Sequence, residues 1–431
     1  MPLRLLHISD IHFHSFTTSG WDEDSDLRNE VVRDVRSMVA EGEIFDGIVV
    51  GGDIAFSASA AEYQVASDWI DLLRQAAGGL AAGQVRVVPG NHDISRLAIA
   101  QSAHARRFRA DLAAAQVLAV DQVLREQVAV DPVAQGLLRP LEEYNKFAER
   151  FGCGTSAQKL AWEDDSMVVD GHAVRLVGIN SVINSGPNDD LGVLVVGQQQ
   201  CRVERDGASV RILMLHHPPR WLKDWTMVEG HMHRAHLILF GHEHAFEARQ
   251  QVAMGTVEVS AGALAPERDE AGERDPYLPT YNVVTLSVTD SEVLNVKIRT
   301  HKWDIRTTRF ERGTPQSFQV SIEPALGARD ADGALAAQEE SISDASPLVV
   351  LPVGEEGLVV DSDEAQRRAE LRNVGVRFTQ LSASSRWHIA FALGVDLTED
   401  HALSASERNV AILRRVRERG LVNQLIEEMD R

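Results

Sequence analysis

This chain of 431 residues has little cysteine and a deficit of basic residues, and each shortage excludes a class of protein. Its two cysteines, Cys153 and Cys201, are too few for a disulfide-stabilised secreted scaffold, and we expect both to be free thiols. Lys and Arg number 43 against 64 Asp and Glu, which gives a formal net charge of −21. A surface of this sign repels polyanions at long range and argues against non-specific coating of nucleic acid.

Long hydrophobic runs are also missing. No apolar stretch approaches the roughly 18 residues that a membrane-spanning helix needs. The first apolar strand begins at Leu3, and a cleaved signal peptide would remove it, so we expect a cytoplasmic protein that does not enter the membrane. The apolar fraction of 44% is that of an ordinary globular protein, and the length allows two or three domains.

Five short blocks of metal-binding residue types are the most informative pattern in the chain. Each follows an apolar run with the composition of a buried strand. Residues just past strand ends converge on one rim of an open α/β sheet, where such folds bind ligands. Carboxylates, an amide and imidazoles gathered there suit divalent transition metals. The blocks are Asp10-Ile11-His12, Gly52-Asp53, Gly90-Asn91-His92-Asp93, His216-His217-Pro218-Pro219 and Gly241-His242-Glu243-His244.

The order of elements predicts an α/β fold. Helically spaced apolar residues over 26–39 and 62–73 lie between the first three apolar strands, and this βαβ pattern predicts a mainly parallel central sheet. Strand-type sequence resumes near 166–169 and 173–180. Three later stretches, 256–260, 281–288 and 292–301, alternate and are rich in β-branched residues. We expect them to form a second sheet packed on the first, which gives a four-layer αββα sandwich.

Residues 96–165 interrupt this rhythm with an Ala-, Gln- and Leu-rich sequence that predicts a helical cap insertion over the metal rim. Arginines at its start are candidates for binding substrate, and we add His217 from the fourth block; the set is Arg96, Arg106, Arg107 and His217. A second basic stretch, 297–312, has six Lys or Arg against two acids. Such a stretch is more often a solvated strand face than a nucleic-acid track.

Composition changes again near residue 323. Residues 323–346 are rich in Gly, Ala, Asp, Glu and Ser, which predicts an acidic flexible linker after a catalytic domain of 1–322. Residues 347–431 have the pattern of short helices and predict a small all-α domain, with a capping box at Ser404–Glu407 and helix ends at Gly394 and Gly420. Its expected core is Leu381, Trp387, Ile389, Leu393, Leu421, Leu425 and Ile426.

In this order the five blocks resemble the calcineurin-like metallophosphoesterase superfamily over roughly residues 1–310. Two dications ~3.5–4 Å apart can activate water and stabilise both the attacking and the leaving oxygen at phosphorus. The resemblance implies that Asp53 bridges the two ions. It places Asp10, His12 and His244 on one metal, and Asn91, His216 and His242 on the other. Manganese is our expectation, although iron, zinc or nickel accept the same ligands.

His92 is the expected catalyst that binds no metal. The resemblance places it near the leaving oxygen, where it can stabilise negative charge or donate a proton, and Asp93 would orient its ring. A hydroxide that bridges the metals would be the nucleophile. Glycines precede the ligands at Gly52, Gly90 and Gly241, where the turns need backbone freedom or close approach.

The sequence favours phosphodiester hydrolysis of a nucleotide-type substrate, because residues 52–57 and 89–93 look most like bacterial phosphodiesterase members. A DNA or RNA nuclease that uses the basic residues is one alternative, and a non-catalytic phosphate-binding protein is another. Residues 363–431 faintly resemble the death-like adaptor domains attached to effector enzymes of bacterial conflict systems. That resemblance implies recruitment of a protein partner or self-association, and the alternative is a helical cap packed on the enzyme.

Overall fold

The computed structural model describes residues 1–15, 22, 24–128, 136–186, 189, 191–203, 209–265, 278–289 and 292–322, and in the C-terminal part 389, 393, 412–417 and 419–429. The chain forms two compact units, residues 1–328 and 329–431. The predicted linker, Leu381, Trp387, Gly394 and the predicted capping box at Ser404–Glu407 lie outside the described residues.

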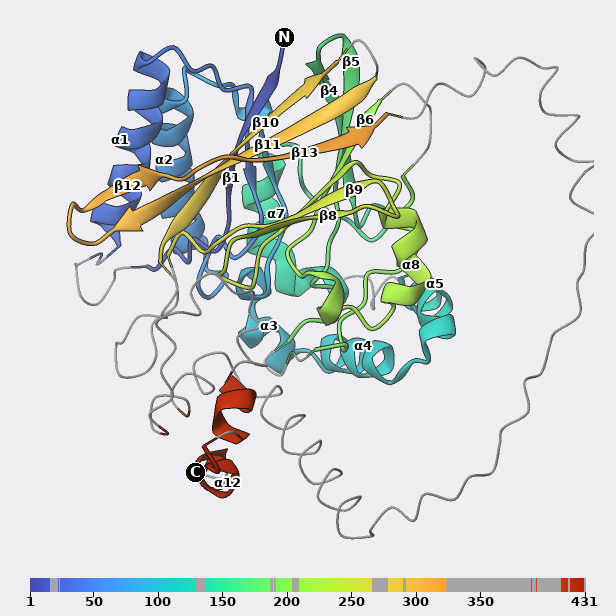
Figure 1. The fold of residues 1–431 in the computed structure, drawn as a ribbon. Coiled ribbons are helices and arrows are strands. Elements are labelled where there is room, and N and C mark those ends of the chain that lie inside the picture. The colour runs from blue at the N-terminus through green and yellow to red at the C-terminus, as the bar shows by residue number, and fades with distance from the viewer. Residues whose placement is uncertain are drawn as a thin grey trace, which may run out of the picture. The chain divides into compact units, whose positions relative to one another are not determined.

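The first sheet has the strand order β12-β11-β10-β1-β2-β3, and β13 also pairs with β11 (Figure 1). β1, β2 and β3 are parallel to one another, whereas β10 is antiparallel to β1, and β11 is antiparallel to β10, β12 and β13. The bounds are β1 Leu3–Ile8, β2 Gly47–Val50, β3 Val85–Val87, β10 Thr280–Val288, β11 Val293–Asp304, β12 Arg309–Arg312 and β13 Gln316–Ser321.

The second sheet has the order β4-β5-β6-β7-β9-β8. Its central strands β5, β6, β7 and β9 are parallel, and the edge strands β4 and β8 are antiparallel to their neighbours. The bounds are β4 Trp162–Val169, β5 His172–Gly178, β6 Val210–Met214, β7 Leu237–Phe240, β8 Glu247–Gln251 and β9 Thr256–Ser260.

Both sheets are mixed, and this corrects two expectations. β10 and β11 belong to the first sheet beside β1, not to a second sheet, and among the described strands of the first sheet only β1, β2 and β3 pair in parallel. The second sheet begins with β4 at Trp162, four residues before the predicted strand. Strand propensity identified these segments, but their partners depend on contacts far apart in sequence, which local patterns do not contain.

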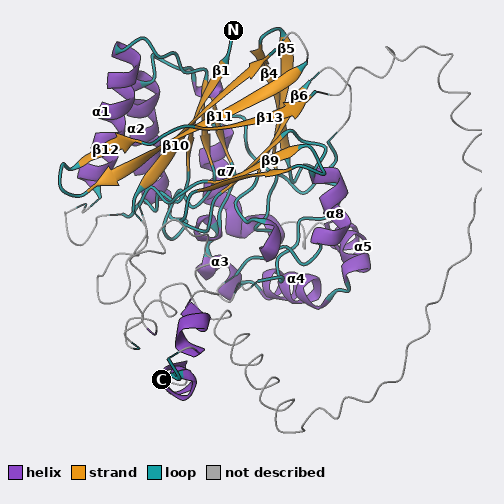
Figure 2. Cartoon of the chain, in the orientation of Figure 1, coloured by secondary structure: helices purple, strands orange, loops and turns teal. Residues whose placement is uncertain are grey.

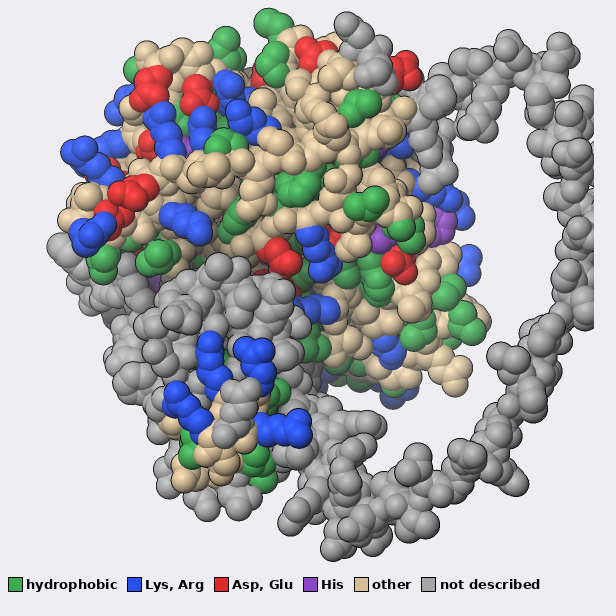
Figure 3. Space-filling view, in the orientation of Figure 1, with side chains coloured by type: hydrophobic (Ala, Val, Ile, Leu, Met, Phe, Trp, Pro, Cys, Tyr) green, Lys and Arg blue, Asp and Glu red, His purple; other side chains and the backbone are tan. Residues whose placement is uncertain are grey.

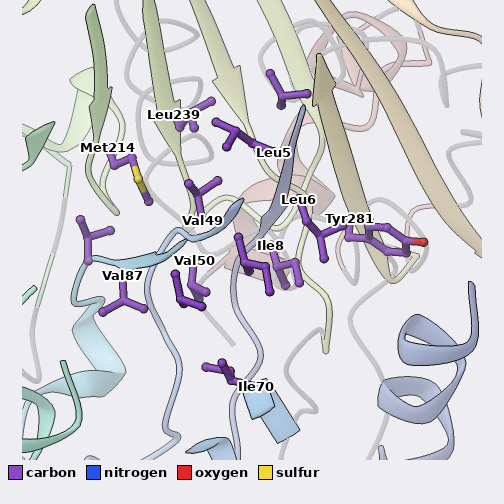
Figure 4. Close-up of a cluster of buried hydrophobic side chains, with 14 of the residues drawn as sticks. Leu5, Leu6, Ile8, Val49, Val50, Ile70, Val87, Met214, Leu239 and Tyr281 are labelled. Atoms are coloured by element: carbon purple, nitrogen blue, oxygen red, sulfur yellow. The ribbon is translucent and has the colours of Figure 1, made fainter. Parts of the chain in front are cut away.

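The main hydrophobic core lies between the sheets and continues to helices α1 (Ser25–Ala40) and α2 (Ala60–Ala76). Figure 4 shows Leu5 and Val49 of the first sheet near Leu239 of the second, whereas Ile70 of α2 lies nearer Val50. Side chains on successive strand residues point to opposite faces, so one strand can serve two cores.

Strand β6 shows this alternation. Ile212 and Met214 belong to the core between the sheets, whereas Leu213 and Leu215 pack in a second cluster with Val228 and Met232 of α8 (Trp225–Met232). Helices therefore cover the outer face of each sheet (Figure 2).

The insertion between β3 and β4 is helical, as expected. It contains α3 Arg96–Gln101, α4 Ala103–Ala114, α5 Val120–Val128 and α7 Glu142–Glu149. Phe108, Leu124 and Leu137 of this insertion pack with Ile183 and Val195, which lie on the loop that follows β5. Arg109 also donates from Nε to the carbonyl of Ser185 at 2.8 Å, so the insertion rests on that loop.

Among the described residues of the C-terminal unit, residues 412–417 are helical and α12 spans Val422–Met429. Five of the predicted core residues belong to its apolar cluster, namely Ile389, Leu393, Leu421, Leu425 and Ile426. Gly420 has φ +70°, and Leu421 N–H donates to the Val416 carbonyl at 2.9 Å, which is how a left-handed residue ends a helix. In the described part of the chain no helix has the length and apolarity to cross a membrane.

Candidate metal centre

The five predicted blocks come from the ends of two sheets rather than from one rim. β1, β2 and β3 of the first sheet lead into Asp10, Asp53 and Asn91, and β6 and β7 of the second lead into His216 and His242. The seven predicted ligands nevertheless meet, because the sheets pack face to face. Parallel strands in both sheets direct their carboxyl ends to this meeting point.

Left-handed backbone shapes the turns that carry the ligands. Five of the seven predicted ligands have positive φ, a conformation that is uncommon for residues other than glycine and clusters at functional sites. Asp10 N–H donates to the Gly52 carbonyl at 3.0 Å, and His12 N–H donates to the Asp53 carbonyl at 3.0 Å, so the first two turns hold each other. The five residues are Asp10 (+54°), His12 (+49°), Asp53 (+51°), His242 (+72°) and His244 (+55°).

Glycines allow these turns to approach one another closely. A Cβ on Gly90 would lie 2.1 Å from Asp53 Oδ1, and one on Gly241 would lie 2.2 Å from Ser9 Oγ. Gly52 combines φ +101° with a Cβ position 2.6 Å from His216 Nδ1. The predicted need for glycine at these three positions is confirmed.

The first group of ligand atoms comes from Asp10, His12 and His244, which lie within 4.8 Å of one another. His244 Nε2 is 3.6 Å from Asp10 Oδ1. The spacing fits one cation between two imidazoles and a carboxylate, although Asp10 and His12 are only two residues apart. Their left-handed φ angles bring both side chains to the same side of the turn.

The second group centres on the amide oxygen of Asn91. Its Oδ1 lies 3.1 Å from His216 Nε2 and 3.1 Å from His242 Nδ1. The other ring nitrogen of His216, Nδ1, lies 2.8 Å from the carbonyl of Gly51. A carbonyl in that position selects the tautomer that leaves the lone pair on Nε2, directed at the centre, and orients the ring as in known metal sites.

Asp53 joins the two groups. Its Oδ2 is 3.2 Å from His216 Nε2, and its carboxylate also lies within 4.8 Å of ligand atoms of Asp10 and of His12. Burial disfavours a charge on His216, but the carboxylates of Asp53 and Asp10 outweigh it and raise the pKa of the ring to about 9. A buried anionic centre that would hold a proton on His216 fits a dication instead, since metal binding displaces such protons.

His92 lies beside this centre. Its backbone N–H donates to Asp53 Oδ1 at 2.8 Å, and its ring lies 4.7 Å from that of His12. The ring's Nδ1 lies 2.8 Å from the carbonyl oxygen of Phe56. This corrects the expectation that Asp93 orients the ring, because a backbone carbonyl occupies that position.

The Asp93 carboxylate points into the protein. It accepts hydrogen bonds from the backbone N–H groups of Ile54, Ala55 and Gly90 and from the hydroxyl of Tyr63. Burial, with repulsion from Asp53, raises the pKa of Asp93 to about 6. Asp93 therefore fastens the loop after β2 to the loop after β3 and positions both Asp53 and Asn91.

A comparison with protein families identifies the chain. The model of the calcineurin-like phosphoesterases matches residues 3–246, more than half of the sequence. The chain belongs to the calcineurin-like phosphoesterase family. The model of the GTPase-associated adaptor domain matches residues 370–431, which confirms the resemblance of the C-terminal segment to adaptor domains of this kind.

The solved structures that resemble this phosphoesterase are distant from it in sequence. No curated protein matches it. A predicted phosphoesterase of Streptococcus pneumoniae is 11% identical, with 74% of this chain and 98% of that chain covered and a TM-score of 0.30. A phosphatase of Mycoplasma pneumoniae is 12% identical, with 75% and 95% covered and a TM-score of 0.32. Scores this low support no argument about function.

Of the four predicted substrate-binding residues, three belong to the helical insertion, and His217 lies beside two ligands of the phosphoesterase, its ring 4.8 Å from that of His216 and 4.5 Å from that of His242. Arg106 of α4 donates to the carbonyl of Ala100 in α3, and Arg107 Nε lies 2.7 Å from Asp111 Oδ1 within α4, so both are engaged inside the insertion. Arg96 is exposed and contributes to the electrostatic environment of Asp189. His217 has no exposed surface, its Nδ1 is 3.0 Å from Ser181 Oγ, and one of its ring nitrogens lies within 4.8 Å of ligand atoms of His216 and His242, so it is buried against the second group of ligands.

Two aromatic residues that our sequence analysis does not predict flank the centre. The Phe56 ring is 40% exposed and lies 5.3 Å from the ring of His92 and 4.2 Å from that of His14. The Trp221 ring lies 4.2 Å from that of His242 on the other side. Phe56 follows the Asp53 block directly, and a large aromatic residue just past a ligand turn is a signal that could have identified it.

The second basic stretch is largely paired. Arg299 donates to both carboxylate oxygens of Glu43 at 2.8 Å. Arg312 lies 2.6 Å from Glu41, and the buried ring of His301 lies 2.7 Å from Asp34. These acids belong to α1 and the turn after it. The segment therefore attaches β11 and β12 to α1, and three of its basic groups are engaged in that contact.

Proposed function

We propose that this metallophosphoesterase hydrolyses phosphodiesters of nucleotide type with two divalent metal ions, manganese by preference. The observation that carries the proposal is the position of Asp53, whose carboxylate lies between two groups of nitrogen and oxygen donors, one of which contains the Asp10 carboxylate, with His92 beside it. Asp10, His12 and His244 would hold one ion, and Asn91, His216 and His242 the other. Such a pair of ions activates water and neutralises charge on the phosphoryl oxygens.

His92 supplies the proton step in this proposal. With Nδ1–H donated to the Phe56 carbonyl, Nε2 is the nitrogen left to face the reacting group. A protonated ring carries a hydrogen on Nε2 as well and can give it to the departing oxygen. Proton transfer of this kind contributes about 10²–10⁴-fold to a rate. Asp93 acts one step away, by fixing the loops that carry Asp53 and His92.

The exposed ring of Phe56 supports a nucleotide-type leaving group. It lies next to His92, the residue we assign to the leaving oxygen, so a planar base attached there can stack on it. Base–aromatic stacking contributes about 1–3 kcal/mol per base in nucleic-acid binding proteins. An aliphatic leaving group would gain much less from this surface.

A nuclease remains the second candidate, and the arginine contacts weigh against it. Arg106, Arg107, Arg299 and Arg312 are all engaged within the protein. A protein that neutralises several phosphates shows binding that weakens steeply with salt, by about 10³–10⁵ between 50 and 200 mM for 6–10 contacts. Salt-dependent binding of single- or double-stranded DNA would favour the nuclease.

The deciding experiment is a substrate screen of the manganese-loaded full chain. Cyclic nucleotides, small diesters, monoesters and both forms of DNA are tested beside the Asp53→Asn variant. Turnover of nucleotide diesters by the wild type alone supports the proposal. Binding of phosphate compounds without turnover of any of them would instead indicate a non-catalytic phosphate-binding protein.

The adaptor match supports a partner for the C-terminal segment. We propose that residues 347–431 recruit a protein partner or self-associate, and that they act separately from hydrolysis. We also keep a cytoplasmic location as a proposal, because a reducing compartment suits the two free thiols Cys153 and Cys201.

A further inference from the structure

A cavity lies where β4, β5, the loop before β6 and the end of α8 meet, and none of the seven predicted metal ligands lines it. Its volume is about 580 Å³, within the range of small-molecule sites. Basic side chains dominate its wall, and Figure 3 shows Lys, Arg and His side chains together at the edge of the molecule near α8. The polar lining residues are Arg175, Arg202, His231, Arg234, Gln199 and Glu163.

The balance of charge in this cavity is the reverse of that of the whole chain. Three guanidinium groups face it, against one carboxylate among the described lining residues, in a protein with a formal charge of −21. Arg175 Nε is 3.2 Å from Asp165 Oδ1 and is partly neutralised. Arg202 and Arg234 have no carboxylate within ion-pair distance among the residues that the structure describes; residues 204–208, which follow the wall, lie outside them.

The charges of Arg202 and Arg234 act on His231 in the wall of this cavity. Burial lowers the pKa of His231, these two charges lower it further, and Asp121 opposes them. A smaller cavity of about 280 Å³ adjoins this one through Gln199 and Arg202 and brings Arg125 and Asp121 to the same side. Uncompensated positive charge in a concave wall attracts and concentrates anions.

The residues of the wall favour one class of anion. Val203 is the one apolar residue among the described lining residues, so the cavity offers little surface to a hydrophobic ligand. Guanidinium groups bind phosphate oxygens through paired N–H donors, and several of them suit a chain of phosphates better than a single one. Arg202 and Arg234, which have no carboxylate partner among the residues that the structure describes, would carry most of this binding.

We propose that this cavity binds a di- or triphosphate chain, free or as part of a nucleotide, at a site separate from the metal centre. Gln199 can donate to a further phosphate oxygen, and Glu163 opposes binding. Because none of these residues belongs to the proposed catalytic set, the inference stands whether or not the phosphodiesterase assignment holds.

The test is calorimetric titration of the full chain in a metal-free buffer, on the Asp53→Asn background so that the metal centre neither retains ions nor turns over ligand. Pyrophosphate, triphosphate, ADP and ATP are compared with orthophosphate and sulfate at constant ionic strength. We expect the di- and triphosphates to bind at least tenfold more tightly than sulfate. Equal affinity of triphosphate and ATP would assign recognition to the phosphate chain, whereas tighter ATP would add a contact to the nucleoside.

Variants locate the binding. Arg202→Ala with Arg234→Ala should weaken triphosphate binding at least tenfold, and Glu163→Gln should strengthen it severalfold. The matched control, Arg33→Ala with Arg309→Ala, removes the same charge from exposed positions and should leave the affinity unchanged. If the first double variant does not fold, Arg202→Glu alone, at an exposed position, replaces it. Equal binding of sulfate and triphosphate would indicate an adventitious ion only and would overturn the proposal. Unchanged triphosphate binding in the Arg202 variants would also overturn it.

Discussion

The Cβ position of Gly90 lies 2.1 Å from Oδ1 and 2.3 Å from the backbone nitrogen of Asp53. No side chain fits there, so Gly90→Ala must push the loop after β3 away from the loop that carries Asp53. We expect the variant to fold but to lose most of its bound metal and its phosphoesterase activity. Metal content measured by elemental analysis after gel filtration checks this.

The control for that experiment is Gly230→Ala in α8, where a Cβ meets nothing within 4 Å. It should retain metal and activity, and alanine in a helix adds about 0.5–1 kcal/mol of stability relative to glycine. Full metal occupancy in Gly90→Ala would show that Asp53 does not bridge the ions from the position seen here.

Variants of Asp53 and of His92 should lose different properties, metal binding in the first case and turnover in the second. Asp53→Asn places a neutral amide between the two groups of donors and should lower metal occupancy, with activity falling in parallel. His92→Ala should keep both metals and reduce turnover of an unactivated diester by about 10²–10⁴-fold. The loss should be smaller for a diester with a good leaving group, which needs no proton. A near-wild-type rate on the unactivated substrate would remove His92 from the mechanism.

The candidate ligand residues could be predicted because each follows a strand within two to four positions, and that signal is local. The left-handed turns at Asp10 and His12 could not, because spacing alone does not say whether two such residues converge or diverge. The sequence predicts that Asp93 orients the His92 ring, whereas the Nδ1 atom of that ring lies 2.8 Å from the carbonyl oxygen of Phe56. A backbone carbonyl has no sequence signature, so this contact needed the structure.

The fold likewise has parts that local sequence predicts and parts that it does not. Helices α1 and α2 agree with their apolar spacing, and the capping box of Ser59 and Glu62, visible in the sequence, places the start of α2. The sequence of β10 alone does not predict which sheet the strand joins. Its residues suit either sheet, and the pairing of Leu5 with Val284 joins segments far apart in the chain.

Asp34 should make stability depend on pH. Burial alone would raise its pKa, but hydrogen bonds from His301 and Tyr281 outweigh that and hold it below its usual value. The ionised carboxylate therefore stabilises the fold above the unfolded pKa of about 3.9, and this contribution is lost as the pH falls through the lower folded value. Asp34→Asn should cost about 1–3 kcal/mol at pH 7, and its deficit should shrink below about pH 4.

Denaturant unfolding at several pH values measures that difference. Asp68→Asn is the matched control, because Asp68 is an exposed helical acid that accepts one hydrogen bond from Gln64. It should change stability by less than about 0.5 kcal/mol at any pH. A deficit in Asp34→Asn that is the same at pH 3 and pH 7 would contradict the role of the ionised carboxylate.

Phe56 should set the preference for the leaving group. If a planar group stacks on its exposed ring, Phe56→Ala should lower kcat/KM for a nucleoside or aryl diester by about 5–150-fold, equivalent to about 1–3 kcal/mol of stacking. Hydrolysis of a dialkyl diester should fall much less. Phe56→Trp should keep the preference, and the carbonyl contact to His92 survives in both variants because it is made by backbone. Equal losses on both substrates would assign Phe56 to packing around His92, and an enzyme inactive on all diesters would instead contradict the proposed function itself.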